Sequence, residues 1–224
     1  MVERIIVGPM RTNCYVYGDG RRDCLLIDPG AEPEAIVSRL EMLNMIPRGI
    51  VLTHGHYDHT SSTNNLVAHY KERQIDLTVA VHESDAAYLG RDSETTNRQN
   101  FEVLGAEALA FFEMSFTPLP APDVLLKEAD TVFDTELTVM ETPGHTPGSI
   151  CLYSGSDALL FCGDTLFFEG VGRTDLPGGD EAQLAESIRT RIVPLPPETA
   201  ILPGHGPLST IEREIKGNPF LRIT

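Results

Sequence analysis

Three histidines and one aspartate gather within a run of seven residues, 53–59. The run reads Thr-His-Gly-His-Tyr-Asp-His and supplies the candidate side chains His54, His56, Asp58 and His59. Imidazole and carboxylate groups are ligands for divalent ions such as zinc, iron and manganese. A single tetrahedral ion that also keeps a position for water does not need four such groups, so the run indicates the beginning of two metal sites.

Three further candidate ligands follow apolar, strand-like runs in the second half of the chain. The tripeptide Pro-Gly-His occurs twice and ends in His145 and His205, and a Gly-Asp-Thr sequence between them contributes Asp164. A Pro-Gly pair favours a tight turn, which directs the next side chain outward from the strand end. We assign the remaining histidines, His69 and His82, to structural roles, because a lone histidine is more often hydrogen-bonded or solvated than a ligand.

The first half of the chain reads as strands and helices that place the histidine run at a strand end. Strands are predicted over 1–7, 12–17, 24–27, 49–52 and 77–81, with a turn at Gly18-Asp19-Gly20. Helices are predicted from Pro33, with an apolar face, and over about 60–73. The strand at 49–52 stops where the histidine run begins, which predicts that the ligands lie on a loop at the carboxyl end of that strand.

The second half repeats the alternation of strands and helices. Strands are predicted over 131–133, 137–140, 150–153, 159–162 and 199–202, and helices over about 180–192 and 210–216. Because each half runs from strands into helix, the pattern predicts an α/β fold in which two mixed sheets pack face to face with helices outside, a four-layer αβ/βα sandwich.

The segment at about 83–127 does not follow this alternation and is predicted as a helical insertion. It combines a polar, helix-like stretch around 91–99 with the aromatic residues Phe101, Phe111, Phe112 and Phe116. We expect these aromatics to pack into the core, and the alternative is a lid or a dimer surface over the site.

Composition narrows the class of protein. The 224 residues carry 41% hydrophobic side chains and a net charge of −16, which predicts one domain over 1–224 and argues against a nucleic-acid partner. The chain shows no apolar run long enough for a bilayer and no signal peptide, so we expect no membrane partner and a cytoplasmic location. The formation of a homo-oligomer is left open by the sequence. The cysteines are predicted to be reduced core residues: Cys14, Cys24, Cys151 and Cys162.

These motifs resemble the metallo-β-lactamase superfamily over nearly the whole chain. The histidine run together with His145, Asp164 and His205 matches the family signature in order. The sequences Gly-Asp-Thr-Leu-Phe at 163–167, Gly-Val-Gly-Arg-Thr-Asp at 170–175 and Asn-Pro-Phe at 218–220 look like the glyoxalase II (hydroxyacylglutathione hydrolase) branch. The chain departs from that branch at Gly55, where glyoxalase II carries a third loop histidine. The resemblance implies a sandwich fold with a dinuclear site at one edge.

The resemblance also implies a role for each candidate residue. It assigns one ion to His54, His56 and His145, a second ion to Asp58, His59 and His205, and the bridging position to Asp164. Zinc is the expected ion for both sites, with iron or manganese as alternatives.

Further positions take weaker assignments. Asp28 would support a ligand from behind, or be only a turn residue before Pro-Gly. Arg173 is predicted as a substrate contact, against an ion pair with Asp175 or Asp180. Tyr57 is predicted either to line the pocket or to pack.

The implied reaction is hydrolysis of a small-molecule thioester such as an S-acyl glutathione. Two ions held close together would supply a bridging hydroxide to attack the carbonyl carbon, and Asp58 would assist proton movement while serving as a ligand. No Gly-x-Ser-x-Gly elbow competes with this interpretation.

Other chemistries stay open at this point. A persulfide dioxygenase would use one iron held by His54, His145 and Asp164, and metal content separates it from the hydrolase. A lactonase would use the same hydroxide. True β-lactamase activity ranks low, because those enzymes usually carry Cys or Ser at the position of Asp164. A non-enzymatic, metal-loaded scaffold is the remaining hypothesis.

Overall fold

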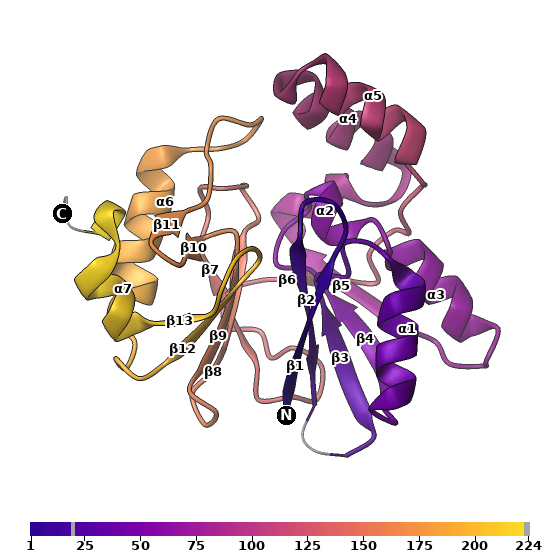
Figure 1. Cartoon of the computed structure of the whole chain (residues 1–224), viewed down its shortest axis with the longest axis horizontal. Helices are drawn as coiled ribbons and strands as arrows, with labels where there is room; N and C mark the ends of the chain where they lie inside the picture. Colours follow the sequence, from indigo (N-terminus) through magenta and orange to yellow (C-terminus); the bar gives the residue numbers. More distant parts are fainter. Residues whose placement is uncertain (19–20, 222–224) are drawn as a thin grey trace. The chain divides into compact units, whose positions relative to one another are not determined.

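A computed structural model describes residues 1–18 and 21–221 of the chain. The chain folds as two compact units, Met1–Leu125 and Leu126–Thr224. Each unit has a mixed β-sheet with α-helices packed on it (Figure 1). The prediction of an α/β fold with two mixed sheets is confirmed. The prediction of one domain over 1–224 stays a prediction, and the predicted turn at Gly18-Asp19-Gly20 lies in part outside the described residues.

The first unit contains a six-stranded sheet in the order β1-β2-β3-β4-β5-β6. Its elements along the chain are β1 (Val2–Val7), β2 (Thr12–Tyr17), β3 (Asp23–Ile27), α1 (Pro33–Met42), β4 (Ile46–Val51), α2 (Tyr57–Thr60), α3 (Thr63–Lys71), β5 (Thr78–His82), α4 (Ser93–Leu104), α5 (Ala106–Ser115) and β6 (Val124–Leu126). Strands β3, β4 and β5 run parallel. Buried Ile36, Leu40 and Leu66 of α1 and α3 pack on the apolar side chains of these strands and form the core of the unit.

The predicted insertion forms the helical pair α4 and α5, preceded by two 3-10 turns at Glu83–Tyr88 and Gly90–Asp92. Phe101 and Phe112 are buried, as expected, but they form a separate cluster with Tyr57 and Leu119 and do not join the core of the sheet. Phe111 stays 45% exposed. The aromatics therefore divide between packing and surface, and the prediction that all of them enter the core was wrong.

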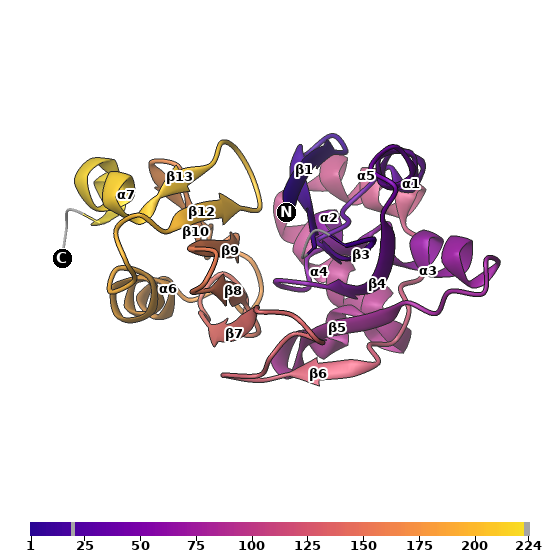
Figure 2. The ribbon, with the colours of Figure 1, turned by 90° about the horizontal axis from the view of Figure 1, so that it is seen from below.

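The second unit contains a five-stranded sheet in the order β13-β12-β9-β8-β7 and a separate hairpin. Its elements are β7 (Thr138–Glu141), β8 (Ile150–Ser154), β9 (Leu159–Gly163), the hairpin strands β10 (Leu166–Phe167) and β11 (Gly170–Val171), α6 (Glu181–Ser187), β12 (Ala200–Pro203), β13 (Ser209–Thr210) and α7 (Ile211–Gly217). Leu184 of α6 and Ile211 of α7 pack with Leu160 and Ile201 of the sheet, and Figure 2 shows α6 and α7 beside these strands. The predicted helix over 180–192 is present, but its last turn, Ile188–Ile192, is a π-helix.

One predicted strand is not formed. Residues 131–133 make only an isolated bridge between Thr131 and Thr138, although their composition favours extended chain. Phe133 has a φ of 50°, in the left-handed region, and the hydroxyl of Thr135 donates to the carbonyl oxygen of Val132. These contacts close a tight turn, and the turn overrides the preference of Thr131 and Val132 for a strand.

All four cysteines are free and buried, so the prediction that they are core thiols is confirmed. Burial raises the pKa of the Cys24 thiol to about 12 and that of the Cys151 thiol to about 11. The pKa values of Cys14 and Cys162 are also raised, again chiefly by burial. Thiols of this kind stay protonated at neutral pH and are poor nucleophiles.

Within residues 1–18 and 21–221, every helix is too short or too polar to cross a lipid bilayer.

Candidate metal centre

The parallel strands of the first unit bring three polar segments to one edge of its sheet. Asp28 follows β3, His54 follows β4, and Asp85 follows β5. Because the carboxyl ends of parallel strands meet at the same edge, residues distant in sequence become neighbours there. The imidazole centroids of His54 and His59 are 4.2 Å apart, and those of His54 and His56 are 4.9 Å apart. The structure therefore brings the histidines of the run together.

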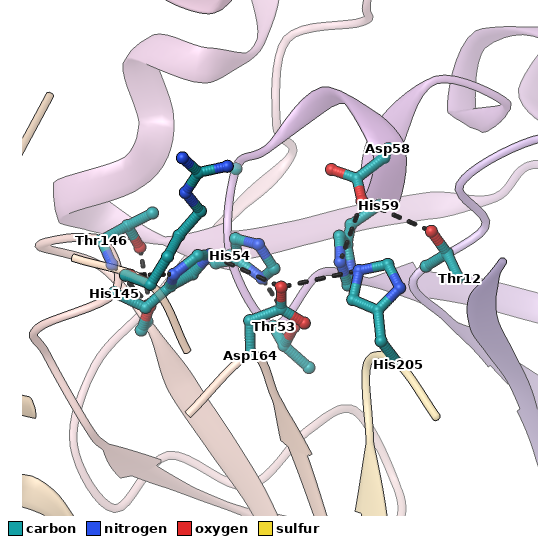
Figure 3. Close-up of polar contacts among 12 residues, drawn as sticks. Thr12, Thr53, His54, Asp58, His59, His145, Thr146, Asp164 and His205 are labelled. Carbon is teal, nitrogen blue, oxygen red and sulfur yellow. Dashed lines mark hydrogen bonds and ion pairs between the residues drawn. The ribbon is translucent and has the colours of Figure 1, made fainter. Parts of the chain in front are cut away.

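The second part of the run is helical. His59 donates its backbone N–H to the carbonyl oxygen of His56, and Ser61 donates to that of Tyr57, which closes α2. The prediction that all ligands of the run lie on a loop was therefore wrong for Asp58 and His59. The helical turn directs both side chains to one place, with 3.6 Å between His59 Nε2 and Asp58 Oδ2 (Figure 3).

Hydrogen bonds to Asp28 and to Thr53 fix which nitrogen of His59 and of His54, respectively, carries the proton. The Asp28 carboxylate accepts from the Thr53 hydroxyl at 2.6 Å and lies 3.0 Å from His59 Nδ1. A carboxylate only accepts, so His59 donates from Nδ1. The Thr53 hydroxyl uses its proton on Asp28, so its oxygen accepts from His54 Nδ1 at 3.1 Å. Both rings are thus held as the tautomer that leaves Nε2 available to a metal ion.

Asp28 itself is placed as a support and not as a ligand. Its oxygens lie within 4.8 Å of nitrogens of His54 and His59, so the three residues form a group that could in principle hold an ion. However, Oδ1 accepts the backbone N–H of Thr53 at 2.7 Å, and Oδ2 takes the two contacts described above. Asp28 is only 2% exposed. With its lone pairs committed to these donors, the carboxylate suits a group that orients the candidate ligands better than one that binds an ion itself.

The environment of Gly55 and Asp85 was not identified from the sequence. The buried carboxylate of Asp85 accepts the backbone N–H of Gly55 at 2.8 Å and so anchors the loop between His54 and His56. A Cβ at residue 55 would lie 2.3 Å from the ring of Tyr88, which packs edge-on against His56. This close approach explains why glycine stands there: Tyr88 occupies the space that a side chain would need. No local pattern marks Asp85 before β5 is known to lie beside β4.

The second unit also brings its candidate ligands together at the ends of strands that run in one direction. Strand β12 is parallel to β9, and β7 is related to β9 by two antiparallel pairings through β8, so all three end at one edge. Asp164 follows β9, His145 follows β7 and His205 follows β12. The prediction that these side chains stand at strand ends is confirmed.

Asp164 lies between two histidines. Its Oδ2 atom is 3.7 Å from His145 Nε2 and 3.6 Å from His205 Nε2. Figure 3 shows the Asp164 side chain between these two histidines. These distances exceed a hydrogen bond but suit ligands of a shared ion, because two atoms each about 2.1 Å from a tetrahedral ion lie about 3.4 Å apart. One carboxylate oxygen therefore faces two imidazole nitrogens at ligand-to-ligand spacing.

The tautomer of His145 is set by the backbone. Its Nδ1 atom lies 2.7 Å from the carbonyl oxygen of Arg173, which only accepts, so Nδ1 carries the proton and Nε2 is left available to a metal ion. Gly172 stands at the back of this contact: a Cβ there would lie 1.8 Å from the backbone oxygen of Asp164 and 3.2 Å from His145 Nδ1. Glycine is required because the two segments approach backbone to backbone.

Replacing Gly172 by alanine is therefore expected to displace the Asp164 segment. The added methyl group should cost about 1–3 kcal/mol of unfolding free energy, as overpacking does, and should lower the affinity for metal. Thermal unfolding and zinc titration measure both effects. Gly217→Ala is the control, because a Cβ at the end of α7 meets nothing within 4 Å. Equal melting temperatures for the two variants would contradict the proposed close approach.

The two predicted substrate contacts have well-defined partners. Arg173 makes a bidentate pair with Asp175 at 2.7 and 2.8 Å, and this pair lowers the pKa of Asp175 to about 2. The Tyr57 hydroxyl donates to the carbonyl oxygen of Ser115 and accepts the N–H of Thr117. The ion pair and the packing position considered for these residues are both present, and their contact with a substrate stays a prediction.

The donor set of each unit fits divalent metal ions. The first unit supplies His54, His56, Asp58 and His59, and the second supplies His145, Asp164 and His205. Imidazole nitrogens combined with carboxylate oxygens suit zinc, iron and manganese. In His54, His59 and His145 the Nδ1 atom is held by an acceptor of the polypeptide, which is the arrangement that surrounds metal-binding histidines.

Comparison with known proteins identifies relatives over nearly the whole chain. A model of the metallo-β-lactamase superfamily matches residues 7–205. Hydroxyacylglutathione hydrolase GloC of Haemophilus influenzae is 33% identical over 230 residues, covering 98% of this chain and 97% of that protein. The BLEG-1 B3 metallo-β-lactamase is similar with a TM-score of 0.84 and 34% identity over 99% of both chains. TTHA1623, solved in a di-iron-bound form, is similar with a TM-score of 0.81 and 34% identity, covering 98% of this chain and all of that one.

Proposed function

This chain belongs to the metallo-β-lactamase superfamily, and from that premise we propose that it is a dinuclear metallohydrolase that cleaves thioesters in the manner of glyoxalase II. The observation that carries the proposal is the position of Asp164, whose Oδ2 atom faces His145 and His205 at 3.7 and 3.6 Å. A carboxylate flanked by two imidazoles in this way suits a bridging ligand. Asp164 replaces the thiol or hydroxyl ligand expected for a true β-lactamase.

We assign the ligands as the family signature orders them. His54, His56 and His145 would hold one ion, and Asp58, His59 and His205 the other, with Asp164 shared. Zinc is the expected ion, and the di-iron form of TTHA1623 supports iron as the first alternative. When bound, such ions supply Lewis acidity and lower the pKa of a water ligand to about 7.

The chain's own groups orient this chemistry. Asp28, Thr53 and the Arg173 carbonyl hold three imidazoles in one tautomer. The Thr12 hydroxyl lies 3.4 Å from Asp58 Oδ2 and donates to it, which positions a carboxylate that would also accept a proton during turnover. Thioester hydrolysis suits this site, because thiolate is a good leaving group. The name of the GloC relative, a hydroxyacylglutathione hydrolase, supports S-acyl glutathione or a related small thioester as the substrate.

The proposal is tested by metal analysis combined with a substrate panel. Purified protein should carry two divalent ions per chain and hydrolyse thioesters, including S-lactoylglutathione, with loss of activity after chelation and recovery with zinc. The panel also contains a lactone, a β-lactam and a persulfide. One iron per chain together with persulfide oxidation would replace the proposal by the dioxygenase, and inertness of the metal-loaded protein towards every compound would leave a scaffold.

Replacement of Arg173 by alanine tests the proposed substrate contact. We expect KM for the thioester to rise about tenfold, the loss of one charged contact, while metal content stays at two ions. The metal is spared because His145 is held by the backbone oxygen of Arg173 and not by its side chain. Arg189→Ala is the matched control, since that exposed arginine pairs with Glu186 on α6. Unchanged kinetics in Arg173→Ala would leave Arg173 as the partner of Asp175 alone.

A further inference from the structure

The first unit contains a pocket of about 330 Å³ that Asp58 helps to line. Its walls come from the turn between β1 and β2, the start of α1, α2 and the helical pair α4–α5. Figure 1 shows α4 and α5 over the end of the sheet where α2 lies. The volume is at the small end of the range for ligand pockets, so it accommodates one group of a substrate.

More of the pocket's surface is apolar than polar, although the neutral polar side chains of Thr12, Ser61, Ser62, Asn65, Ser115 and Thr117 also line it. Val7, Met10, Tyr57, Phe101 and Phe111 contribute aliphatic and aromatic surface. Tyr57 and Phe101 are fixed by the buried aromatic cluster, whereas Phe111 is 45% exposed and borders the pocket from α5. When an apolar group of a ligand covers a half-exposed aromatic at the border of a pocket, the free energy of the complex is lowered.

The charged groups of the pocket all have one sign. Glu32, Glu34 and Asp58 line it, and none of the described residues that line it is lysine, arginine or histidine. The start of α1 offers little to an anion, because Pro33 occupies its first turn without an N–H and Glu34 adds a negative charge there. An anionic group lodged in this pocket, beyond the ions proposed at Asp58, would therefore lose hydration without gaining a cationic side chain as a partner.

We propose that this pocket binds an uncharged, apolar group of the substrate and that the enzyme selects thioesters that carry such a group beside the scissile bond. The inference rests on the proposed function, because it takes Asp58 to mark the reaction centre. Either side of a thioester supplies the required chemistry: the acyl chain or the substituent on sulfur. Carboxylates, including those of glutathione, must then stay outside the pocket.

A matched set of four thioesters tests the selection. Phenylacetyl and succinyl groups are each joined to N-acetylcysteamine or to 3-mercaptopropionate. The two arms of each thioester are the acyl group and the thiol group, and the four compounds carry a carboxylate on neither arm, on one arm or on both. Phenylacetyl-N-acetylcysteamine should have the highest kcat/KM. A carboxylate on the arm that enters the pocket should lower kcat/KM by at least about tenfold. The arm that shows the larger loss is the one that the pocket binds.

Two pairs of variants connect the selection to the pocket. Phe111→Ala should lower kcat/KM for the uncharged thioester about fivefold, because apolar wall is lost, while Met114→Ala on the same helix stays within twofold. Met114 is 89% exposed and does not line the pocket. Glu34→Lys should raise the use of the anionic thioesters relative to the neutral one by about threefold or more, whereas Glu41→Lys, at the far end of α1, should not.

Binding of thioethers separates this inference from the proposed function. The thioether analogues of the neutral and anionic compounds lack the scissile carbonyl, so calorimetry measures their affinity without turnover. Tighter binding of the neutral thioether, lost in Phe111→Ala and kept in Met114→Ala, supports the pocket even if no thioester is hydrolysed. Equal use of charged and uncharged thioesters by the wild type, or equal behaviour of the Phe111 and Met114 variants, overturns it.

Discussion

Asp164→Ala is expected to lose both metal ions and thioesterase activity together. Asp164 is the shared ligand in the proposed centre, and its oxygen faces His145 and His205. Losing the charge stabilisation that the ions supply, about 4 kcal/mol, corresponds to a decrease in kcat/KM of about a thousandfold. Elemental analysis and thioester kinetics on the same preparation measure the two effects.

Two further variants make this experiment specific. Asp164→Asn keeps the size of the side chain and one oxygen, so a fall in metal content in this variant reports the charge and not a cavity. Asp134→Ala removes an exposed carboxylate from the same unit and should keep both ions and full activity. Circular dichroism checks that each variant is folded. Two ions per chain in folded Asp164→Ala would refute the bridging role.

Asp28→Asn is expected to weaken metal binding about 10- to 100-fold although Asp28 is not assigned as a ligand. The carboxylate faces three donors: the Thr53 N–H, the Thr53 hydroxyl and His59 Nδ1. An amide presents NH2 on one side, so in either orientation a donor meets a donor. If the amide nitrogen faces His59, the ring must switch its tautomer and protonate Nε2, which then no longer binds metal.

The same substitution should lower stability by about 1–3 kcal/mol, because it leaves a buried donor without an acceptor. Asparagine is chosen over alanine because Asp28 has a φ of 52°, a left-handed conformation that asparagine also adopts readily. Asp23→Asn is the control, because Asp23 lies at the exposed start of β3, the strand that Asp28 follows. Zinc competition with a chelator and thermal unfolding are the measurements. Wild-type zinc affinity in folded Asp28→Asn would remove Asp28 from the site.

The sequence was sufficient to predict features that depend on neighbouring residues along the chain. Buried strands appear as short apolar runs that stop at a polar, glycine or proline residue, so the positions of His54, Asp164 and His205 after strands could be predicted. The same local signal placed α1 correctly, where Pro33 begins the helix and an apolar face follows. Residues 131–133 show the limit of such signals. Their composition is typical of a strand, but a side-chain hydrogen bond from Thr135 closes a turn there instead.

Features that depend on which strands become neighbours could not be predicted. Asp85 anchors the Gly55 loop only because β5 pairs with β4, and Asp28 reaches His59 only because β3 lies on the other side of β4. The helical form of α2 depends on one turn of backbone hydrogen bonds, which is too short to give a periodic pattern. The aromatic cluster around Tyr57 likewise joins segments about 45–60 residues apart.

Because polypeptide groups already fasten Nδ1 of His54, His59 and His145, these rings have lost their freedom to rotate before any ion arrives. Little of an incoming ion's affinity is then spent on ordering them. Donors held in this way would accept ions of similar radius with similar ease, so we expect the supply of metal during synthesis to decide which ion is bound. Cells grown in zinc-rich medium should yield the zinc-bound protein, and cells grown in iron-rich medium should yield the same polypeptide with iron bound.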